Sequence, residues 1–284
     1  MLPEIHTNPT MKDITKADIE DDILQSCKSK IRRTKTITKL DPNQKPIMAP
    51  ELEEEVEAAL VQYTQRHLWK DWGMDYLGMS GAAVLFEGPC GTGKTTIARY
   101  MSKRVGKGIL PLNMKDVGGK APGHTERMIS EHFDKAKIDG NKTIFIDECE
   151  AILWDRSKAG SDSMWMVGVI DELLMRVAEY KGLIIFATNR PEIVDPALKD
   201  RCFAVLQIPM PEYKQRLALW KQKIPTRFPL HPTTAQLEQL ATLQMSGRQI
   251  ENTIKREASF AIRGGRKPTF ASMLSLATQS THNK

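Results

Sequence analysis

The chain has 284 residues, of which 40% are hydrophobic and 27% are charged. This balance is typical of folded globular proteins, and the length excludes a peptide hormone or a disulfide-stapled toxin. The 41 basic and 35 acidic residues give a formal net charge of +6, which permits contact with nucleic acid without requiring it.

Neither a membrane span nor a secretion signal is visible in the sequence. No stretch approaches the roughly 18 uninterrupted apolar residues of a spanning helix, and acidic residues interrupt the first 30 positions. The 4 cysteines are far apart and lack the spacing of metal ligands, which argues against a zinc site or a disulfide framework. We therefore expect a cytoplasmic protein with no membrane partner.

Residues 1–48 are expected to form a flexible N-terminal extension. They are polar and irregular, with an acidic patch at 18–22 followed by a basic patch at 28–39. A solvated arm and a contact for an acidic partner such as DNA both fit this composition.

An α/β fold is predicted from Pro50 onward. A helical pattern of apolar residues begins at Pro50 and ends near 72–73, and buried strands and helices then alternate. Strands are expected at 82–86, 108–112, 143–146, 183–187 and 205–208, and helices at 95–104, 126–137 and 163–180. This alternation predicts a doubly wound, parallel, five-stranded sheet.

The strands stop after Pro211. Three helical patterns follow, at 212–222, 234–242 and 247–262, joined by turns that contain proline and glycine. We therefore expect a large α/β subdomain over 49–210 and a small helical lid subdomain over 211–284.

A glycine-rich segment, Gly88 to Thr95, fits the pattern GxxxxGK[ST] between a predicted strand and a predicted helix, the context that this phosphate-binding motif requires. Its glycines let backbone N–H groups turn toward phosphate oxygens at a helix N-terminus. Lys94 is expected to reach the β- and γ-phosphates, and the Thr95 hydroxyl to bind Mg²⁺. The predicted nucleotide-binding residues are Gly88, Pro89, Cys90, Gly91, Thr92, Gly93, Lys94, Thr95 and Thr96.

Two carboxylates end the predicted strand Ile144-Phe-Ile-Asp147-Glu148. Taken alone, an acid pair at this position would more often cap a helix. Together with the phosphate-binding motif it predicts that Asp147 is a second Mg²⁺ ligand and that Glu148 is the base that orients the attacking water.

From about Pro50 to Leu276 the chain resembles the AAA family of ring-forming ATPases. Gly88 to Thr95 matches its Walker A motif and Ile144 to Glu148 its Walker B motif. The segment Ala187-Thr-Asn189-Arg-Pro191 is similar to its first sensor. The resemblance implies a P-loop NTPase fold with ATP and Mg²⁺ as cofactors, and it implies that Asn189 senses the γ-phosphate.

Two arginines are assigned by the same resemblance. Asp195-Pro-Ala-Leu198 followed by Arg201 is similar to the second region of homology, which implies that Arg201 is a catalytic arginine finger that reaches the ATP of a neighbouring subunit. Ser246-Gly247-Arg248 is similar to a second sensor, which implies that Arg248 contacts the nucleotide. A Gly-Arg pair also opens many helices that have no such role.

Two departures from the family pattern affect these expectations. Asp200 precedes Arg201 where many relatives have another arginine, so only one finger is assigned. Ala121 occupies the position at which protein-threading relatives place an aromatic pore residue, and alanine cannot provide the apolar area that grips a polypeptide. Lys115 and Lys120 are alternative contacts for an acidic substrate or a phosphate backbone.

The resemblance implies an ATP hydrolase that assembles into a homo-oligomeric ring, expected to be a hexamer. In one hypothesis the ring remodels or disassembles a protein substrate, which it meets directly or through an adaptor. In the alternative it is an ATP-gated nucleic-acid loader or scaffold. The compact second region and lid favour the first hypothesis, and the missing pore aromatic and the basic arm favour the second.

Overall fold

A computed structural model describes residues 45–74, 83–113, 123–153 and 164–282, all within one unit, Pro42–Lys284. The N-terminal basic patch and the expected pore positions Lys115, Lys120 and Ala121 lie outside the described residues. Among the helices described, none combines the length and the apolar character needed to cross a membrane.

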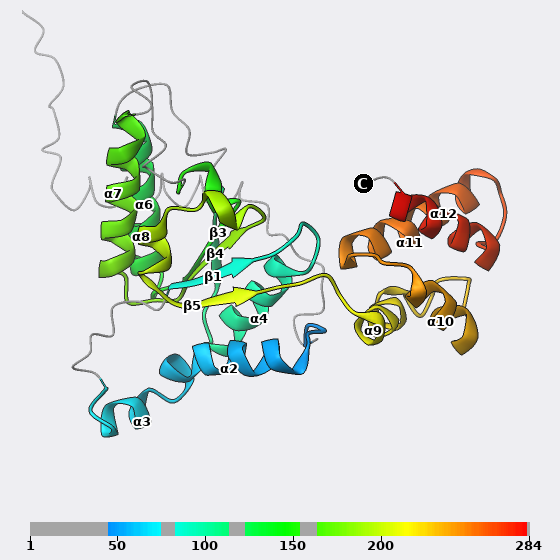
Figure 1. Cartoon of the computed structure of the whole chain (residues 1–284), viewed down its shortest axis with the longest axis horizontal. Coiled ribbons are helices and arrows are strands. Elements are labelled where there is room, and N and C mark those ends of the chain that lie inside the picture. Colours follow the sequence, from blue (N-terminus) through cyan, green and yellow to red (C-terminus); the bar gives the residue numbers. More distant parts are fainter. Residues whose placement is uncertain (1–44, 75–82, 114–122, 154–163, 283–284) are drawn as a thin grey trace, which may run out of the picture. The chain divides into compact units, whose positions relative to one another are not determined.

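Five parallel strands form one sheet in the order β2-β3-β4-β1-β5 (Figure 1). The central strands β1 and β4 are buried at every residue, as expected for a parallel sheet that is covered on both faces. The prediction of a parallel five-stranded α/β sheet is confirmed. The strands are β1 (Ala83–Glu87), β2 (Ile109–Asn113), β3 (Thr143–Asp147), β4 (Ile184–Thr188) and β5 (Cys202–Gln207).

Helices cover the two faces of the sheet with separate apolar clusters (Figure 1). On one face, α6 (His124–Ile138) and α7 (Met164–Glu179) contribute buried side chains that include Phe133. On the other face, α2 (Pro50–Thr64) and α4 (Lys94–Arg104) do the same. The helix that follows the phosphate-binding motif is therefore anchored directly on the sheet.

The first predicted helix is interrupted. Instead of one helix to 72–73, α2 ends at Thr64 and a short helix, α3 (Arg66–Asp71), follows a break at Gln65. Four apolar residues of α2 pack into the core, whereas no residue of α3 is buried. The packing that stabilises an amphipathic helix thus stops before α3 begins.

The edge strand β5 starts earlier than predicted. It begins at Cys202 rather than at Val205, and its exposed and covered residues nearly alternate. Phe203 is 51% and Val205 38% exposed, so this edge strand is not buried on both faces as the prediction assumed. Three short elements were not predicted: η2 (Cys149–Ala151), η5 (Pro191–Ile193) and α8 (Pro196–Lys199).

Four helices follow the sheet, where three were predicted: α9 (Tyr213–Lys223), α10 (Thr234–Thr242), α11 (Gly247–Arg263) and α12 (Phe270–His282). The starts of α9, α10 and α11 each carry a capping box, in which two side chains bond reciprocally to backbone N–H groups. These helices enclose a third apolar cluster that includes the fully buried Trp220, Leu240 and Met273. These four helices therefore have an apolar core of their own.

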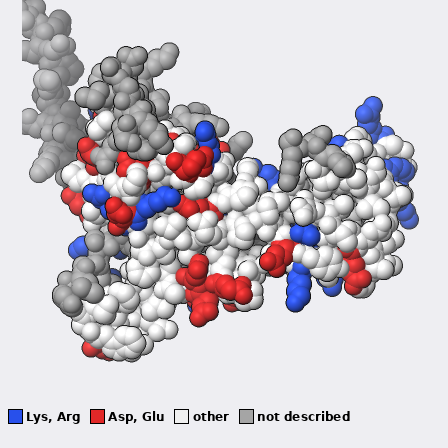
Figure 2. Space-filling model, in the orientation of Figure 1, with Lys and Arg blue, Asp and Glu red and all other residues white. Residues whose placement is uncertain are grey.

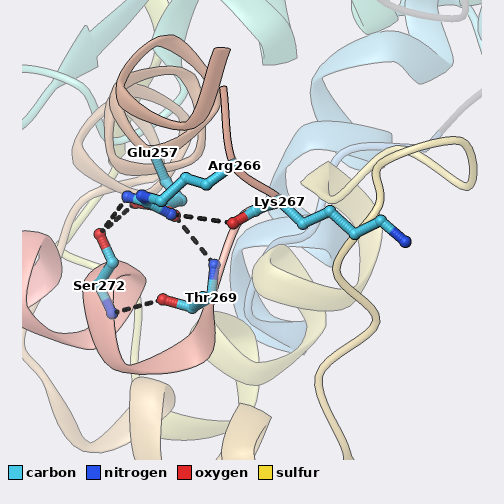
Figure 3. A network of polar contacts seen from close by, with 5 residues as sticks. All are labelled: Glu257, Arg266, Lys267, Thr269 and Ser272. Atoms are coloured by element: carbon cyan, nitrogen blue, oxygen red, sulfur yellow. Dashed lines mark hydrogen bonds and ion pairs between the residues drawn. The ribbon is translucent and has the colours of Figure 1, made fainter. Parts of the chain in front are cut away.

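A buried carboxylate fastens the unpredicted helix α12 to α11 (Figure 3). Glu257 has no exposed surface and accepts hydrogen bonds from the Arg266 guanidinium at 2.8 Å, from the Thr269 N–H at 3.0 Å and from the Ser272 hydroxyl. Burial raises the pKa of Glu257, but the bonds from Arg266, Ser272 and Thr269 outweigh burial and hold the pKa below its ordinary value.

Candidate functional site

The phosphate-binding loop joins β1 to α4, and two of its glycines are required by the backbone. A Cβ at Gly88 would lie 2.1 Å from the Ile208 carbonyl oxygen, so no larger residue fits there. Gly93 has a φ of +111° and caps α4, where its carbonyl accepts the N–H groups of Thr96 and Ile97 at 2.8 and 2.9 Å. The loop is thus shaped locally, as the glycine pattern predicts.

Lys94 curls back over the loop that precedes it. Its ammonium donates to the carbonyl oxygens of Gly88 at 2.6 Å and Pro89 at 2.9 Å, and the residue is only 8% exposed. Burial lowers the pKa of Lys94, and the negative charge of Asp147 is the strongest opposing influence. The structure therefore brings together the lysine and the acid that the sequence assigned to one site.

Other residues predicted to bind the nucleotide lie in the same loop and in the first turn of α4. The Thr92 hydroxyl donates to the Pro89 carbonyl at 3.0 Å. Thr95 and Thr96 lie half-buried in the first turn of α4, and Cys90 is exposed.

Two acids follow one another at the carboxyl end of β3. Burial raises the pKa of Asp147, opposed by the hydrogen bond from the Glu148 N–H to Oδ1 at 3.1 Å and by Lys94. Glu148 is exposed and has a φ of +53°, an uncommon conformation for a residue other than glycine. Such outliers concentrate at functional sites, and this one turns the chain sharply after the strand.

A third acid, Glu150, was not predicted. It lies in η2 and its charge acts on both Lys94 and Asp147. Its Oε2 atom is buried without a hydrogen-bond partner among the described residues. The signal in the sequence was its position two residues beyond Glu148.

The sheet order places Asn189 at the same edge as the loop and the acids. Strand β4 lies between β3 and β1, and the Gly88 N–H donates to the carbonyl of Thr188, the last residue of β4, at 3.3 Å. Asn189 follows Thr188 directly and is exposed. In parallel sheets the carboxyl ends of neighbouring strands form the ligand-binding edge, so Gly88, Asp147 and Asn189 share it.

The two predicted arginines differ in their contacts. The Arg248 backbone N–H donates to the Gly91 carbonyl at 3.2 Å and its guanidinium to the Cys90 sulfur at 3.0 Å, so Arg248 lies against the loop. Arg201 is exposed, and its guanidinium donates to the Ala197 carbonyl of its own segment at 3.0 Å.

An ion pair between a buried carboxylate and a partly exposed lysine, next to the loop, was also missed from the sequence. Glu87 ends β1, is 5% exposed, and pairs with the Lys199 ammonium at 2.7 Å. The Gln207 amide donates to its other oxygen at 2.5 Å. The pair links the strand before the loop to the helix that precedes Arg201. The available signal in the sequence was that an acid, Glu87, directly follows the apolar residues of the predicted strand.

The donor set fits Mg²⁺ bound together with a nucleotide. No group of three or more His, Cys, Asp or Glu residues in the described part of the chain could hold a metal by itself. Mg²⁺ is usually held by one or two protein oxygens plus phosphate oxygens and water. The Thr95 hydroxyl and the half-buried Asp147 carboxylate beside the loop match this pattern.

Residues 84–210 match the family model described as "ATPase family associated with various cellular activities (AAA)". The chain therefore contains an AAA ATPase domain. The matched AAA region runs through all five strands and includes Gly88 to Thr96, Asp147, Glu148, Asn189 and Arg201, whereas Arg248 lies beyond it.

Relatives of the AAA domain include proteins named as an ATPase and as a nucleotidase. Similar proteins include ATPase family gene 2 protein homolog A from Homo sapiens, 33% identical over 184 residues, which are 62% of this chain and 20% of the human protein. The Cell division cycle protein 48 homolog from Archaeoglobus fulgidus is 32% identical over 189 residues, 63% of this chain and 25% of that protein. A proteasome-activating nucleotidase from Sulfurisphaera tokodaii is 30% identical over 223 residues, 74% of this chain and 54% of that protein.

The AAA match and these names support ATP hydrolase activity. The alignments with these three relatives span between about a fifth and about half of the relatives' lengths.

Proposed function

We propose that this AAA domain hydrolyses ATP to ADP and phosphate, and that hydrolysis drives the remodelling or disassembly of a protein partner. The observation that carries the proposal is the position of Lys94. Its ammonium is held inside the phosphate-binding loop by two carbonyls, and its charge is favoured by the negative charge of Asp147 at the carboxyl end of β3.

Nucleotide binding would replace contacts that Lys94 makes within the loop. Its ammonium would leave the carbonyls of Gly88 and Pro89 for the β- and γ-phosphate oxygens. The N-terminus of the 11-residue helix α4 adds a partial positive charge on the same side. A buried lysine that exchanges neutral acceptors for anionic ones gains a stronger hydrogen bond.

The acids and Asn189 would act on the γ-phosphate. Thr95 and Asp147 would hold Mg²⁺, which would neutralise part of the phosphate charge. Glu148, exposed at the end of β3, would orient and deprotonate the attacking water. Asn189, at the same edge of the sheet, would hydrogen-bond the γ-phosphate and sense its loss.

Arg201 supports assembly into a ring. Its guanidinium is exposed and its hydrogen bond lies within its own segment, which leaves it available to a neighbouring subunit. A head-to-tail contact in which each subunit completes the next site closes into a ring when the rotation permits. We propose a hexamer, in agreement with the family resemblance.

A protein partner is favoured by the names of the relatives. They include a Cell division cycle protein 48 homolog, proteasome-activating nucleotidases, and a putative 26S proteasome regulatory subunit homolog from Methanocaldococcus jannaschii. We propose that this chain likewise acts on protein, directly or through an adaptor. For its organisation we propose an extension over 1–48, an ATPase core over 49–210 and a lid over 211–284.

Steady-state phosphate release from the purified full chain tests the ATPase assignment. We expect Lys94→Ala to abolish both turnover and the binding of a fluorescent ATP analogue. Glu148→Gln should lower turnover by about 100-fold or more while binding persists. Glu131→Gln, which removes an exposed carboxylate paired with Arg127 on α6, serves as the matched control. Unchanged turnover in Glu148→Gln would show that another group activates the water.

The partner class is tested separately, by titrating an unfolded polypeptide into the same assay. A several-fold rise in turnover that is absent in Glu148→Gln supports a protein substrate. A flat response at saturating polypeptide, together with normal basal turnover, contradicts it and leaves the ATPase assignment standing.

A further inference from the structure

The positive charge of the chain is concentrated in its C-terminal quarter. Residues 211–282 carry 11 basic and 4 acidic side chains, whereas residues 1–210 carry 29 and 31. The excess positive charge of the whole protein therefore belongs to the four helices that follow the sheet. An excess of this size on a small domain attracts polyanions.

Two of the four acids are neutralised by ion pairs with basic side chains of the same segment. Glu251 pairs with Lys223 at 3.2 Å and with Lys255, and the buried Glu257 pairs with Arg266 at 2.8 Å. Figure 3 shows Arg266 turned toward Glu257 while the neighbouring Lys267 extends away from the network.

Three of the cations that remain exposed after this pairing lie in the second half of α11 and in the turn that follows it. Arg256, Arg263 and Lys267 are exposed, and none of them belongs to an ion pair between described residues. Their charges are directed to solvent or to a ligand.

The unpaired arginines flank an exposed aromatic ring. Arg256, Phe260 and Arg263 are spaced four and three residues apart on α11, so they lie along one side of the helix. Phe260 is 44% exposed. In Figure 2, blue side chains gather where α11 ends and its following turn begins, with little red among them.

We propose that Arg256, Phe260 and Arg263 on α11, together with Lys267 in the turn that follows, bind single-stranded nucleic acid. These four residues are called the α11 stripe. The Phe260 ring offers a face on which an unpaired base stacks, and the three cations contact the phosphates on either side. Exposed aromatic rings between cations are the common device of proteins that hold single strands without strict sequence preference. This inference does not depend on the proposed ATPase function.

The aromatic ring decides between a nucleic acid and an acidic peptide. Carboxylates of a peptide would satisfy the arginines but would leave Phe260 without a planar partner. The bases of a duplex are stacked on one another, which hides their faces from Phe260. A single strand supplies phosphates and exposed base faces together, so it satisfies all four residues of the stripe.

The test is fluorescence anisotropy of a labelled single-stranded oligonucleotide of about 16 nucleotides, titrated with the full chain without ATP. Arg256→Ala/Arg263→Ala should weaken binding by about 10-fold or more and reduce the salt dependence, because two phosphate contacts are lost. Phe260→Ala should weaken it by about 5-fold to 100-fold through lost stacking. Lys214→Ala/Lys221→Ala, which removes equal charge from exposed positions on α9, should bind like the wild type.

Two further variants make the outcome decisive. Phe260→Leu keeps an apolar side chain without a flat face, so unchanged affinity in this variant overturns the stacking role. Lys94→Ala should bind the oligonucleotide like the wild type, which separates the stripe from the ATP site. The proposal is also overturned if the wild type does not bind the oligonucleotide. It is overturned as well if polyglutamate at equal charge concentration displaces the oligonucleotide, and that result points to an acidic protein as the ligand.

Discussion

The Arg248 guanidinium, on the first turn of α11, donates a hydrogen bond of 3.0 Å to the Cys90 sulfur in the phosphate-binding loop. Cys90 is exposed, whereas Cys149 is buried and Cys202 is partly covered. Burial raises the pKa of Cys149 well above its ordinary value and that of Cys202 to about 12. Among the described cysteines, Cys90 is the one classed as exposed.

We predict that iodoacetamide at pH 8 modifies Cys90 at least about tenfold faster than Cys149 or Cys202, because the thiolate is the reactive form and the other two thiols hold their protons. Mass spectrometry of digested protein at successive times measures the three rates. ATP should slow the reaction at Cys90 if the nucleotide occupies the loop. Faster labelling of Cys149 than of Cys90 would contradict the burial seen in the structure.

Gly88→Ala should destabilise the fold. The added methyl carbon would lie 2.1 Å from the Ile208 carbonyl oxygen, and the Ile208 N–H is itself bonded to the Glu87 carbonyl at 2.7 Å, so the backbone cannot easily retreat. We expect the free energy of unfolding in urea to fall by more than about 3 kcal/mol. Gly106→Ala is the control, because Gly106 has a φ of +69° but open space around its Cβ position. Its cost should be about 1–2 kcal/mol, and equal losses in both variants would rule out the clash.

Arg201→Ala should stop turnover without weakening nucleotide binding. Turnover should fall by about 1000-fold or more, because the transition-state charge loses its arginine. Arg227→Ala, which removes another exposed arginine, is the control and should leave turnover unchanged. Phosphate release and binding of a fluorescent ATP analogue measure the two effects.

Mixing two inactive variants tests whether Arg201 acts on a neighbour. In a mixed ring, a subunit with Arg201→Ala still provides Glu148, and a Glu148→Gln subunit beside it still provides Arg201. Partial recovery of turnover on mixing is expected. No recovery, in rings shown to exchange subunits, would place Arg201 in its own subunit's site.

The Glu257 network should make the lid sensitive to acid. The pKa of Glu257 in the folded chain is below its ordinary value of 4.5, so its stabilising contribution is present above pH 4.5 and is lost as the pH falls through the folded pKa. Glu257→Gln should cost roughly 1.5–3 kcal/mol at neutral pH through weaker hydrogen bonds. Urea denaturation between pH 7 and pH 3 should show this cost shrinking with acid. If the free energies of unfolding of the wild type and Glu257→Gln differ by a constant amount across that range, Glu257 is not the titrating group. The control is Glu238→Gln, at an exposed position on α10.

Local patterns predicted most of the fold and the centre of the site. The sheet follows from short apolar runs such as Thr143–Ile146, because strands buried on both faces need apolar side chains on both sides. Lys94 and Asp147 lie close together because a phosphate-binding motif and an acid-tipped strand can meet only at the carboxyl edge of a parallel sheet.

Features that depend on contacts distant in sequence were missed. Helix α12 carries few charges and many small polar residues, and its start is fixed by Glu257 through Thr269 and Ser272, which no local pattern reveals. The pairing of Glu87 with Lys199 joins residues more than 100 positions apart. The family resemblance implied a role for Arg248 but not its contact with Cys90. That contact depends on how the helical segment packs against the loop.

Gly91 joins the predicted phosphate-binding loop to the start of α11. Its carbonyl accepts the Arg248 N–H at 3.2 Å, and the Ser246 and Arg248 side chains approach so closely that a Cβ at Gly91 would lie 2.8 Å from the Arg248 Cβ. The 17-residue helix α11 begins at this contact and is about 25 Å long. Any tilt of about 10° at the loop would therefore displace the far end of the helix by about 4 Å, so α11 can act as a lever that amplifies small movements around the phosphates.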